Sequence, residues 1–284
     1  MRQVYINGAY MPETKAKISV FDRGFLFGDA VYEVTYVIDR KLVDYQGHMT
    51  RLRRSLGEID MSLAMTDADL LAAHRELVKL NDIDEGLVYL EVTRGAADRD
   101  FIFPDASVPN TVVLFTQKKS LMDAPAATRG LNVLTVEDQR WERCDIKTVQ
   151  LLYPSLAKTR GKAQGADDVW FQRDGYVTEG SSNNAYIVSA EGKIITHETN
   201  NDILHGITRK AVMDTLADLG LDFEERPFLV TEALEAAEAF STSSSGLVTP
   251  VVSIDGKQIG DAKPGPVSKQ LRQKYIEGIR RRAI

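Results

Sequence analysis

Apolar and polar residues alternate in short runs through the first third of the chain, and two longer segments there repeat every three to four positions. The run Val4-Tyr5-Ile6 followed by Asn7-Gly8 predicts the start of a β-hairpin. Segments 48–60 and 70–80 carry apolar residues at helical spacing and predict amphipathic helices. The strand-like runs of this region lie at 30–38, 87–93 and 111–115.

The rest of the chain shows a second region of the same mixed kind. Strand-like runs lie near 131–136, 168–172, 184–188, 193–196 and 247–254, and helical spacing lies at 151–164, 207–219 and 267–281. Residues 120–129 break this periodicity and predict an interdomain linker. The sequence therefore predicts two domains, 1–119 and 130–284, of mixed α/β (α+β) class rather than a doubly wound sheet.

The charge balance argues against a polyanion as the main partner. The 284 residues include 35 Lys and Arg against 41 Asp and Glu, a net charge of −6, which disfavours nucleic acid and anionic membranes. The single cysteine, Cys144, excludes an intramolecular disulfide and favours a reducing compartment. No apolar run reaches the roughly 18 residues of a transmembrane helix, and the start lacks a signal-peptide core. We therefore expect a soluble cytoplasmic protein that acts on a small molecule.

Several common catalytic signatures are missing. The sequence has no G-x-x-x-x-G-K-[ST] phosphate loop, no G-x-S-x-G nucleophile elbow and no G-x-G-x-x-G motif after a strand. The histidines show no paired ligand spacing such as H-E-x-x-H, so we expect no metal site. They are His48, His74, His197 and His205.

The most informative stretch runs from Thr178 to Asn184, where one carboxylate, Glu179, lies among small hydroxyl and amide side chains. In a pocket, Glu179 would hold a positive charge on a ligand, and the hydroxyls and backbone N–H groups would orient its polar atoms. Gly, Ser and Asn are also ordinary turn residues. Taken alone, this stretch fits a surface turn equally well.

Further groups suit a phosphorylated, positively charged aromatic ligand. Gly206 to Arg209 stands at a predicted helix start, where backbone N–H groups and the Thr208 hydroxyl would bind phosphate, although an ordinary helix cap has the same pattern. Ser241 to Gly246 connects two strand-like runs and offers hydroxyl and N–H donors, unless it is a flexible serine-rich loop. Arg51, one helical turn after His48, adds a charged phosphate ligand.

The candidate nucleophile is Lys147. It lies between a strand pattern and a helix pattern, whereas Lys158 and Lys162 fall within a predicted helix and are expected to be solvated. A partly buried lysine loses its proton easily enough to form a Schiff base with an aldehyde. Position alone leaves a structural role for Lys147 open.

Together these motifs form one ordered set: Phe21-Asp22-Arg23-Gly24, Phe27-Gly28-Asp29, His48-x-x-Arg51-Leu52, Asp145-Ile146-Lys147, Thr178-Glu179-Gly180-Ser181-Ser182-Asn183, Gly206-Ile207-Thr208-Arg209 and Ser241-Thr242-Ser243-Ser244. In this order and spacing, from about residue 3 to about residue 280, the chain resembles a fold-type IV pyridoxal-phosphate-dependent aminotransferase. The resemblance implies a small N-terminal α/β domain and a larger C-terminal cofactor-binding domain.

The resemblance also implies roles. Lys147 resembles the lysine that binds pyridoxal 5′-phosphate as a Schiff base and moves the substrate proton, and Glu179 the carboxylate that keeps the pyridine nitrogen protonated. Leu204 matches the residue that packs on the ring face. The candidate cofactor-binding residues are Arg51, Lys147, Glu179, Ser181, Leu204, Gly206, Ile207, Thr208, Ser243 and Ser244. The candidate substrate-binding residues are Tyr32, Arg99, Phe101, Ser182 and Ser245.

Within the family, Val31-Tyr32-Glu33-Val34 resembles the D-amino-acid aminotransferases rather than the Y-F-E-G of branched-chain enzymes. Arg99, after Arg94, points the same way because a guanidinium binds a carboxylate in bidentate fashion. Two positions depart from that pattern, since Phe101 stands where a histidine is usual and Tyr36 where a lysine is usual.

These departures leave the binding of the substrate carboxylate open. Arg99 would bind it alone or together with Arg94 or Arg23. If no arginine binds it, Arg99 is a surface residue of an acidic loop and the site would admit (R)-primary amines.

The expected function is ping-pong amino transfer between a D-amino acid and a 2-oxo acid such as 2-oxoglutarate, through pyridoxamine phosphate. The alternatives are an (R)-amine or branched-chain aminotransferase, an aminodeoxychorismate lyase of the same fold, or a non-catalytic binding protein. Family resemblance further implies a homodimer whose sites borrow residues from the partner. The loop around Arg99 is the segment expected to cross.

Overall fold

The computed structural model describes all residues, 1–284. Its contacts divide the chain into two compact units, which we call the N-terminal and the C-terminal unit. The N-terminal unit comprises Met1–Ser120, Ile146–Gln150 and Arg282–Ile284, and the C-terminal unit comprises Leu121–Asp145 and Leu151–Arg281. The sequence had placed every residue after 130 in the second domain, so 146–150 and 282–284 depart from that expectation.

Backbone pairing explains both departures. The N–H of Tyr32 donates to the carbonyl of Lys147 at 3.0 Å, and the N–H of Val149 donates to the carbonyl of Ala30 at 3.2 Å. At the C-terminus, Leu42 and Ile284 exchange two backbone hydrogen bonds of 2.8 and 3.0 Å. Local periodicity cannot reveal pairing between segments so far apart in sequence.

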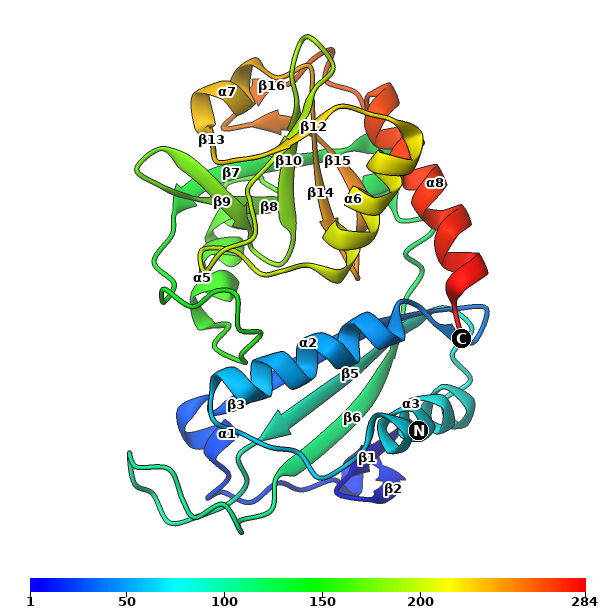
Figure 1. Cartoon of the computed structure of the whole chain (residues 1–284), viewed down its shortest axis with the longest axis vertical. Coiled ribbons are helices and arrows are strands. Elements are labelled where there is room, and N and C mark those ends of the chain that lie inside the picture. The colour runs from blue at the N-terminus through cyan, green and yellow to red at the C-terminus, as the bar shows by residue number, and fades with distance from the viewer. The chain divides into compact units, whose positions relative to one another are not determined.

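The N-terminal unit contains a six-stranded sheet in the order β2-β1-β6-β5-β3-β4, in which every neighbouring pair is antiparallel (Figure 1). The strands are β1 (Gln3–Ile6), β2 (Ala9–Pro12), β3 (Ala30–Ile38), β4 (Lys41–Leu42), β5 (Gly86–Thr93) and β6 (Thr111–Lys118). Asn7 and Gly8 have φ of 47° and 95°, which suits the predicted two-residue hairpin turn between β1 and β2.

Helices cover one face of this sheet. α2 (Tyr45–Glu58) packs on β3, and α3 (Asp67–Leu80) packs on β6 and β5 (Figure 1). A capping box at Thr66 begins α3, since the Thr66 hydroxyl and the Asp69 carboxylate each accept a backbone N–H of the other residue. The buried core beneath the helices includes Val31, Met49, Leu52, Leu77, Val88, Leu90, Val92 and Leu114. The unit also contains η1 (Glu13–Lys15) and α1 (Arg23–Phe27).

The C-terminal unit is built on a ten-stranded mixed sheet in the order β12-β11-β10-β14-β15-β7-β8-β9-β13, with β16 paired to β15. β7 is parallel to both β8 and β15, and β11 is parallel to β12. The strands are β7 (Leu131–Glu137), β8 (Asp168–Arg173), β9 (Tyr176–Gly180), β10 (Asn184–Val188), β11 (Ile194–Thr196), β12 (Phe223–Glu225), β13 (Phe228–Leu229), β14 (Glu238–Ser243), β15 (Leu247–Ile254) and β16 (Lys257–Gln258).

Five helices accompany this sheet, and its core is apolar and aromatic. They are α4 (Pro125–Arg129), α5 (Leu152–Ala163), α6 (Ile207–Leu219), α7 (Val230–Glu235) and α8 (Pro266–Arg282). Trp170 and Phe228 meet edge-to-face in the main core cluster, with ring centroids 6.3 Å apart. No helix of the structure is long and apolar enough to span a membrane.

Two sequence interpretations need correction. The segment predicted as a linker contains helix α4, because Pro125 can start a helix at a position where no backbone N–H is needed. Thr178 to Asn184 is not one polar turn, since Thr178 and Glu179 lie in β9 and Asn184 begins β10. Only residues 181–183 turn the chain, so Glu179 projects from a strand.

Candidate active site

Lys147 is held at the edge of strand β3 in the N-terminal unit. Its carbonyl accepts the N–H of Tyr32, and its own N–H donates to the Ser55 hydroxyl at 3.3 Å. The preceding Ile146 is buried in the core of this unit. The Lys147 Nζ lies 4.1 Å from the centroid of the Tyr32 ring, and no carboxylate of the unit pairs with it. The backbone is therefore fixed while the half-buried amine is left with an aromatic contact.

The predicted phosphate ligand Arg51 lies in a buried ionic cluster. Its Nε and Nη2 donate to the two carboxylate oxygens of Glu33 at 2.8 and 2.7 Å, and His48 Nδ1 lies 2.7 Å from Glu33 Oε2. Burial alone would raise the pKa of Glu33, but Arg51 and His48 lower it to about 2. The sequence placed His48 and Arg51 on one helix face, and in the structure both side chains contact the carboxylate of Glu33.

Two of the three arginines considered for the substrate carboxylate are already bound inside the N-terminal unit. Arg23 and Arg94 each donate through Nε to Asp29 Oδ2 at 2.8 Å. Arg94 also donates to the carbonyls of Asp60 and Ile59 at 3.0 and 2.6 Å. Both arginines are buried, so their role here is to fix the loop that follows β5.

Arg99, the third arginine, is exposed. Its guanidinium lies over the rings of Phe27 and Phe101, at 5.2 and 5.4 Å from their centroids. Phe101 is 78% exposed and contacts Phe27 edge-to-face. The position where a histidine is usual thus contributes an aromatic surface beside Arg99.

Glu179 is buried in the C-terminal unit and its oxygens accept four hydrogen bonds. Arg140 Nη1 donates to Oε1 at 2.6 Å, and Asn184 Nδ2 donates to Oε2 at 2.9 Å. The backbone N–H of Leu204 donates to both oxygens at 3.1 Å. Strand β9, strand β10 and the segment before α6 therefore converge on one carboxylate.

Asp138 and Arg140 complete this network and were not predicted from the sequence. Arg140 donates to both oxygens of Asp138, at 2.9 and 2.8 Å, and Asp138 Oδ2 also accepts the Thr178 hydroxyl at 3.0 Å. The Asp-x-Arg pattern directly after β7 is the only local signal for this pair, and it does not point to Glu179. Burial raises the pKa of Glu179, and pairing with Arg140 offsets only part of this rise.

The turn after Glu179 is fixed by Asp168. The Ser181 hydroxyl and the Asn183 amide each donate to this carboxylate, at 2.5 and 2.9 Å, and Lys158 Nζ lies 3.2 Å from it. Ser182, at the tip of the turn, is exposed. Ser181 thus shapes the turn, and Ser182 alone presents its side chain to solvent.

Asn184 links Glu179 to the start of α6. Besides its bond to Glu179, Asn184 Nδ2 donates to the carbonyl of Leu204 at 2.9 Å. Its Oδ1 would lie only 2.2 Å from a Cβ built on Gly206, so a side chain at that position would displace it. Gly206 is the cap of α6 and makes no side-chain cap bond, which leaves the N–H groups of the first turn to other acceptors.

The serine-rich turn lies beside the same strand. In the pairing of β10 with β14, Asn184 is opposite Thr242, and the half-buried Ser243, Ser244 and Ser245 follow directly. Arg272 Nη1 and the Thr249 hydroxyl donate to the carbonyl of Gly246 at 3.0 and 2.7 Å. Two side-chain donors therefore fix the backbone of the turn at Gly246.

A family model described as amino-transferase class IV matches residues 30–254. The chain belongs to the class IV aminotransferases. This class IV aminotransferase is 42% identical to a D-alanine aminotransferase of Staphylococcus haemolyticus over 98% of the chain and 99% of that protein. It is 39% identical to a D-alanine aminotransferase of Staphylococcus aureus strain MSSA476, with the same coverage.

A solved structure agrees on the fold. The branched-chain amino acid aminotransferase of T.th. with pyridoxamine 5′-phosphate superposes with a TM-score of 0.89 at 26% identity, over 98% of this chain and 94% of that one. The predicted fold class is confirmed.

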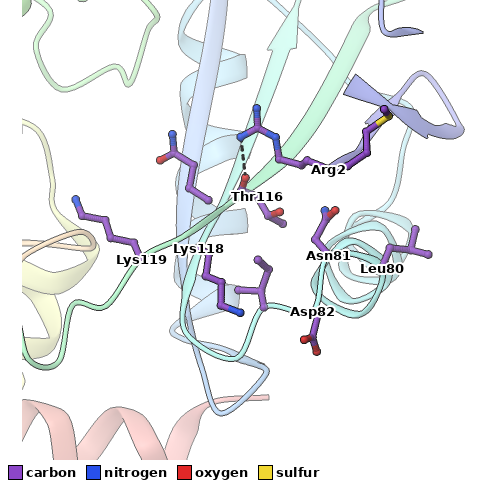
Figure 2. A pocket seen from close by; sticks show the side chains of 10 residues that line it. Arg2, Leu80, Asn81, Asp82, Thr116, Lys118 and Lys119 are labelled. Atoms are coloured by element: carbon purple, nitrogen blue, oxygen red, sulfur yellow. Dashed lines mark hydrogen bonds between the residues drawn. The ribbon is translucent and has the colours of Figure 1, made fainter. Parts of the chain in front are cut away.

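One pocket lies within the N-terminal unit, and none of the residues that line it is a predicted site residue. It is a cavity of about 660 Å³ lined by Arg2, Asn81, Thr116 and Lys118, among others (Figure 2). Figure 2 shows Arg2 donating to the carbonyl of Thr116, and its guanidinium also pairs with Glu13.

Proposed function

We propose that this class IV aminotransferase transfers the amino group of a D-amino acid to a 2-oxo acid, with pyridoxal 5′-phosphate as its cofactor. The observation that carries the proposal is the state of the half-buried Lys147, whose backbone is fixed and whose Nζ lies over the Tyr32 ring without a carboxylate partner in the N-terminal unit. The identity to D-alanine aminotransferases over nearly the whole chain supports the choice of substrate.

The residues of the C-terminal unit suit the polar groups of this cofactor. Glu179 is buried with a raised pKa, as expected of a carboxylate that shares a proton with a pyridine nitrogen. The N-terminal N–H groups of α6, at Ile207 and Thr208, and the ordered serine turn offer phosphate donors. Leu204 is half-buried and offers an apolar contact for a ring face. In the N-terminal unit, Glu33 fixes the guanidinium of Arg51 as the charged phosphate ligand.

When bound, pyridoxal phosphate supplies an electron sink that stabilises negative charge at the substrate Cα. Lys147 would bind the aldehyde carbon of the resting cofactor. When it is not attached to the cofactor, the Lys147 amine would act as the base that takes and returns the proton at the substrate Cα. Glu179 would hold the proton on the pyridine nitrogen throughout, with Arg140 and Asn184 fixing its two oxygens.

We assign the substrate carboxylate to Arg99, since Arg23 and Arg94 are bound to Asp29. Arg99 lies in an exposed loop with Phe101, Ile102 and Phe103, which are 78%, 77% and 50% exposed. Exposed apolar side chains of this size are typical of contact surfaces. We therefore propose a homodimer in which this loop contacts the partner, and a cytoplasmic location consistent with the free thiol of Cys144.

The deciding experiment assays D-alanine and L-leucine side by side, with 2-oxoglutarate as the acceptor. L-leucine is included because branched-chain aminotransferases share the fold. We expect turnover of D-alanine and at least about a hundredfold lower kcat/KM for L-leucine. Turnover of L-leucine alone would overturn the D-specific assignment.

A second measurement separates an enzyme from a binding protein with the same fold. The holoenzyme mixed with D-alanine and no acceptor should release one pyruvate per active site and then stop, because the amino group stays on the enzyme. The variant Lys147→Ala should release none. An aminodeoxychorismate lyase would instead release pyruvate from aminodeoxychorismate continuously, without a 2-oxo acid acceptor.

A further inference from the structure

The N-terminal sheet has a second face whose side chains are not covered by α2 and α3. Because side chains alternate along a strand, Tyr32 of β3, Tyr89 and Glu91 of β5, and Val113 and Phe115 of β6 all lie on this face. Each of them is half-buried, whereas their neighbours on the covered face are fully buried. Glu91 is the only charged residue among these five.

A series of contacts connects Glu91 to Lys147. The Lys147 Nζ lies over the Tyr32 ring, and the Tyr32 ring stacks on Tyr89 with centroids 5.3 Å apart and an interplanar angle of 24°. The Tyr89 hydroxyl donates to Glu91 Oε2 at 2.7 Å. Glu91 is also directly opposite Tyr32 in the pairing of β3 with β5, where side chains on one face touch.

The charge of Glu91 has no counter-ion in the unit. Its hydrogen-bond donor is the neutral Tyr89 hydroxyl, and no lysine or arginine pairs with it. This differs from Glu33, the neighbouring buried carboxylate of β3, which Arg51 neutralises. Burial raises the pKa of Glu91, and the Tyr89 hydrogen bond offsets part of that rise. A half-buried carboxylate without a cation favours positive charge or a hydrogen-bond donor beside it and disfavours another carboxylate.

We infer that Glu91 is a specificity-determining residue that disfavours a second carboxylate on the substrate and favours an ammonium group or hydrogen-bond donor in its side chain. The inference rests on the proposed function, because the role of Lys147 is what brings an amino acid to this face. A like charge approaching an unpaired carboxylate in a partly desolvated site is repelled, and an opposite charge is attracted. The same repulsion makes pyruvate a better acceptor than 2-oxoglutarate.

The test compares the unchanged holoenzyme with Glu91→Gln and Tyr89→Phe, using D-alanine, D-glutamate and D-ornithine. Glu91→Gln removes the charge and keeps the size. It should raise kcat/KM for D-glutamate relative to D-alanine by about tenfold or more, and lower the D-ornithine ratio by a similar factor. Tyr89→Phe keeps the charge, so it should preserve the discrimination against D-glutamate.

Binding is measured separately as the inhibition constants of glutarate and butyrate, which differ by one carboxylate. Glu91→Gln should tighten glutarate about tenfold and leave butyrate within about threefold. Unchanged ratios in Glu91→Gln, or equal changes in Glu91→Gln and Tyr89→Phe, would overturn the inference. Lack of D-alanine turnover by the unchanged enzyme would instead count against the proposed function. The ratio of the glutarate and butyrate inhibition constants, measured with any substrate that the enzyme turns over, would still decide the role of Glu91.

Discussion

Each unit buries one glutamate against an arginine, but the two carboxylates are held differently. Glu33 receives two hydrogen bonds from Arg51 and one contact from His48, so its charge is neutralised on the spot and its pKa falls to about 2. Glu179 shares Arg140 with Asp138, to which Arg140 donates twice. The pKa of Glu179 is raised.

The contrast separates a carboxylate that serves the fold from one that serves chemistry. A neutralised carboxylate such as Glu33 binds a proton only in strong acid and serves to fix its partners in place. A buried carboxylate with a shared cation and a carboxylate neighbour retains proton affinity, which a group facing a pyridine nitrogen requires. The same comparison applies to Glu91, which has no cation at all.

The largest expected effect is on the Glu33 cluster. Glu33→Gln leaves the Arg51 guanidinium buried without its counter-charge, and we expect unfolding free energy to fall by about 3–5 kcal/mol in urea melts. The matched control is Asp214→Asn, which removes an exposed partner of Lys210 on α6. Asp214→Asn should lower the unfolding free energy by less than about 0.5 kcal/mol. A loss as large as that of Glu33→Gln would show that burial does not make the Glu33–Arg51 pair more important for stability.

Acid provides the next test of the same cluster. Because the pKa of Glu33 falls from 4.5 to about 2 on folding, its contribution is complete above pH 4.5 and is lost as the pH falls towards 2. At roughly 1.4 kcal/mol per pKa unit this amounts to about 3 kcal/mol. Urea melts between pH 4.5 and 2 should show the unfolding free energy of the unchanged protein falling with pH, and a weaker fall in Glu33→Gln. The same pH dependence in both proteins would contradict the assignment.

Glu179 should show the opposite pH dependence. Its folded pKa is raised, so stability falls as the pH rises from 4.5 through the folded value. Glu179→Gln should remove that fall, leaving stability at neutral pH unchanged or higher. Activity should drop by about a hundredfold, because a preorganised charge at the reacting ring is lost. A variant that loses stability but keeps its activity would reverse the roles of the two glutamates.

The smallest expected effect concerns the link through Asn184. Gly206→Ala places a Cβ against Asn184 Oδ1, and we expect it to cost about 1–2 kcal/mol and to lower activity by disturbing Glu179. Gly57→Ala is the control, since Gly57 lies in α2 with open space around it. That change should be neutral or stabilise by about 0.5–1 kcal/mol. Equal stability and activity of the two variants would show that a side chain at Gly206 does not disturb Glu179 through Asn184.

Local pattern predicted the elements whose signal is contained within them. Strand β3 has the predicted bounds because β-branched and aromatic residues fill it, and α6 spans the predicted Ile207–Leu219 with Gly206 as its cap. Strand β9 was missed because its polar residues, Thr178 and Glu179, find hydrogen-bond partners in Asp138 and Arg140, some 40 positions earlier.

Long-range partners were likewise out of reach of the sequence at the site. The motif order drew attention to Lys147, Glu179 and Gly206. It could not show that Asp29 binds Arg23 and Arg94, or that Glu33 holds Arg51, because those contacts form only when the strands pair. The sequence therefore named candidate residues but not the contacts that hold each one.

The central claim, that Lys147 is the covalent attachment point of pyridoxal phosphate, is tested most directly by borohydride reduction of the holoenzyme followed by peptide mapping. We expect loss of the yellow colour and a phosphopyridoxyl group on the peptide that carries Lys147, with none in Lys147→Ala. Label on Lys158 or Lys162, or label that persists in Lys147→Ala, would contradict the account.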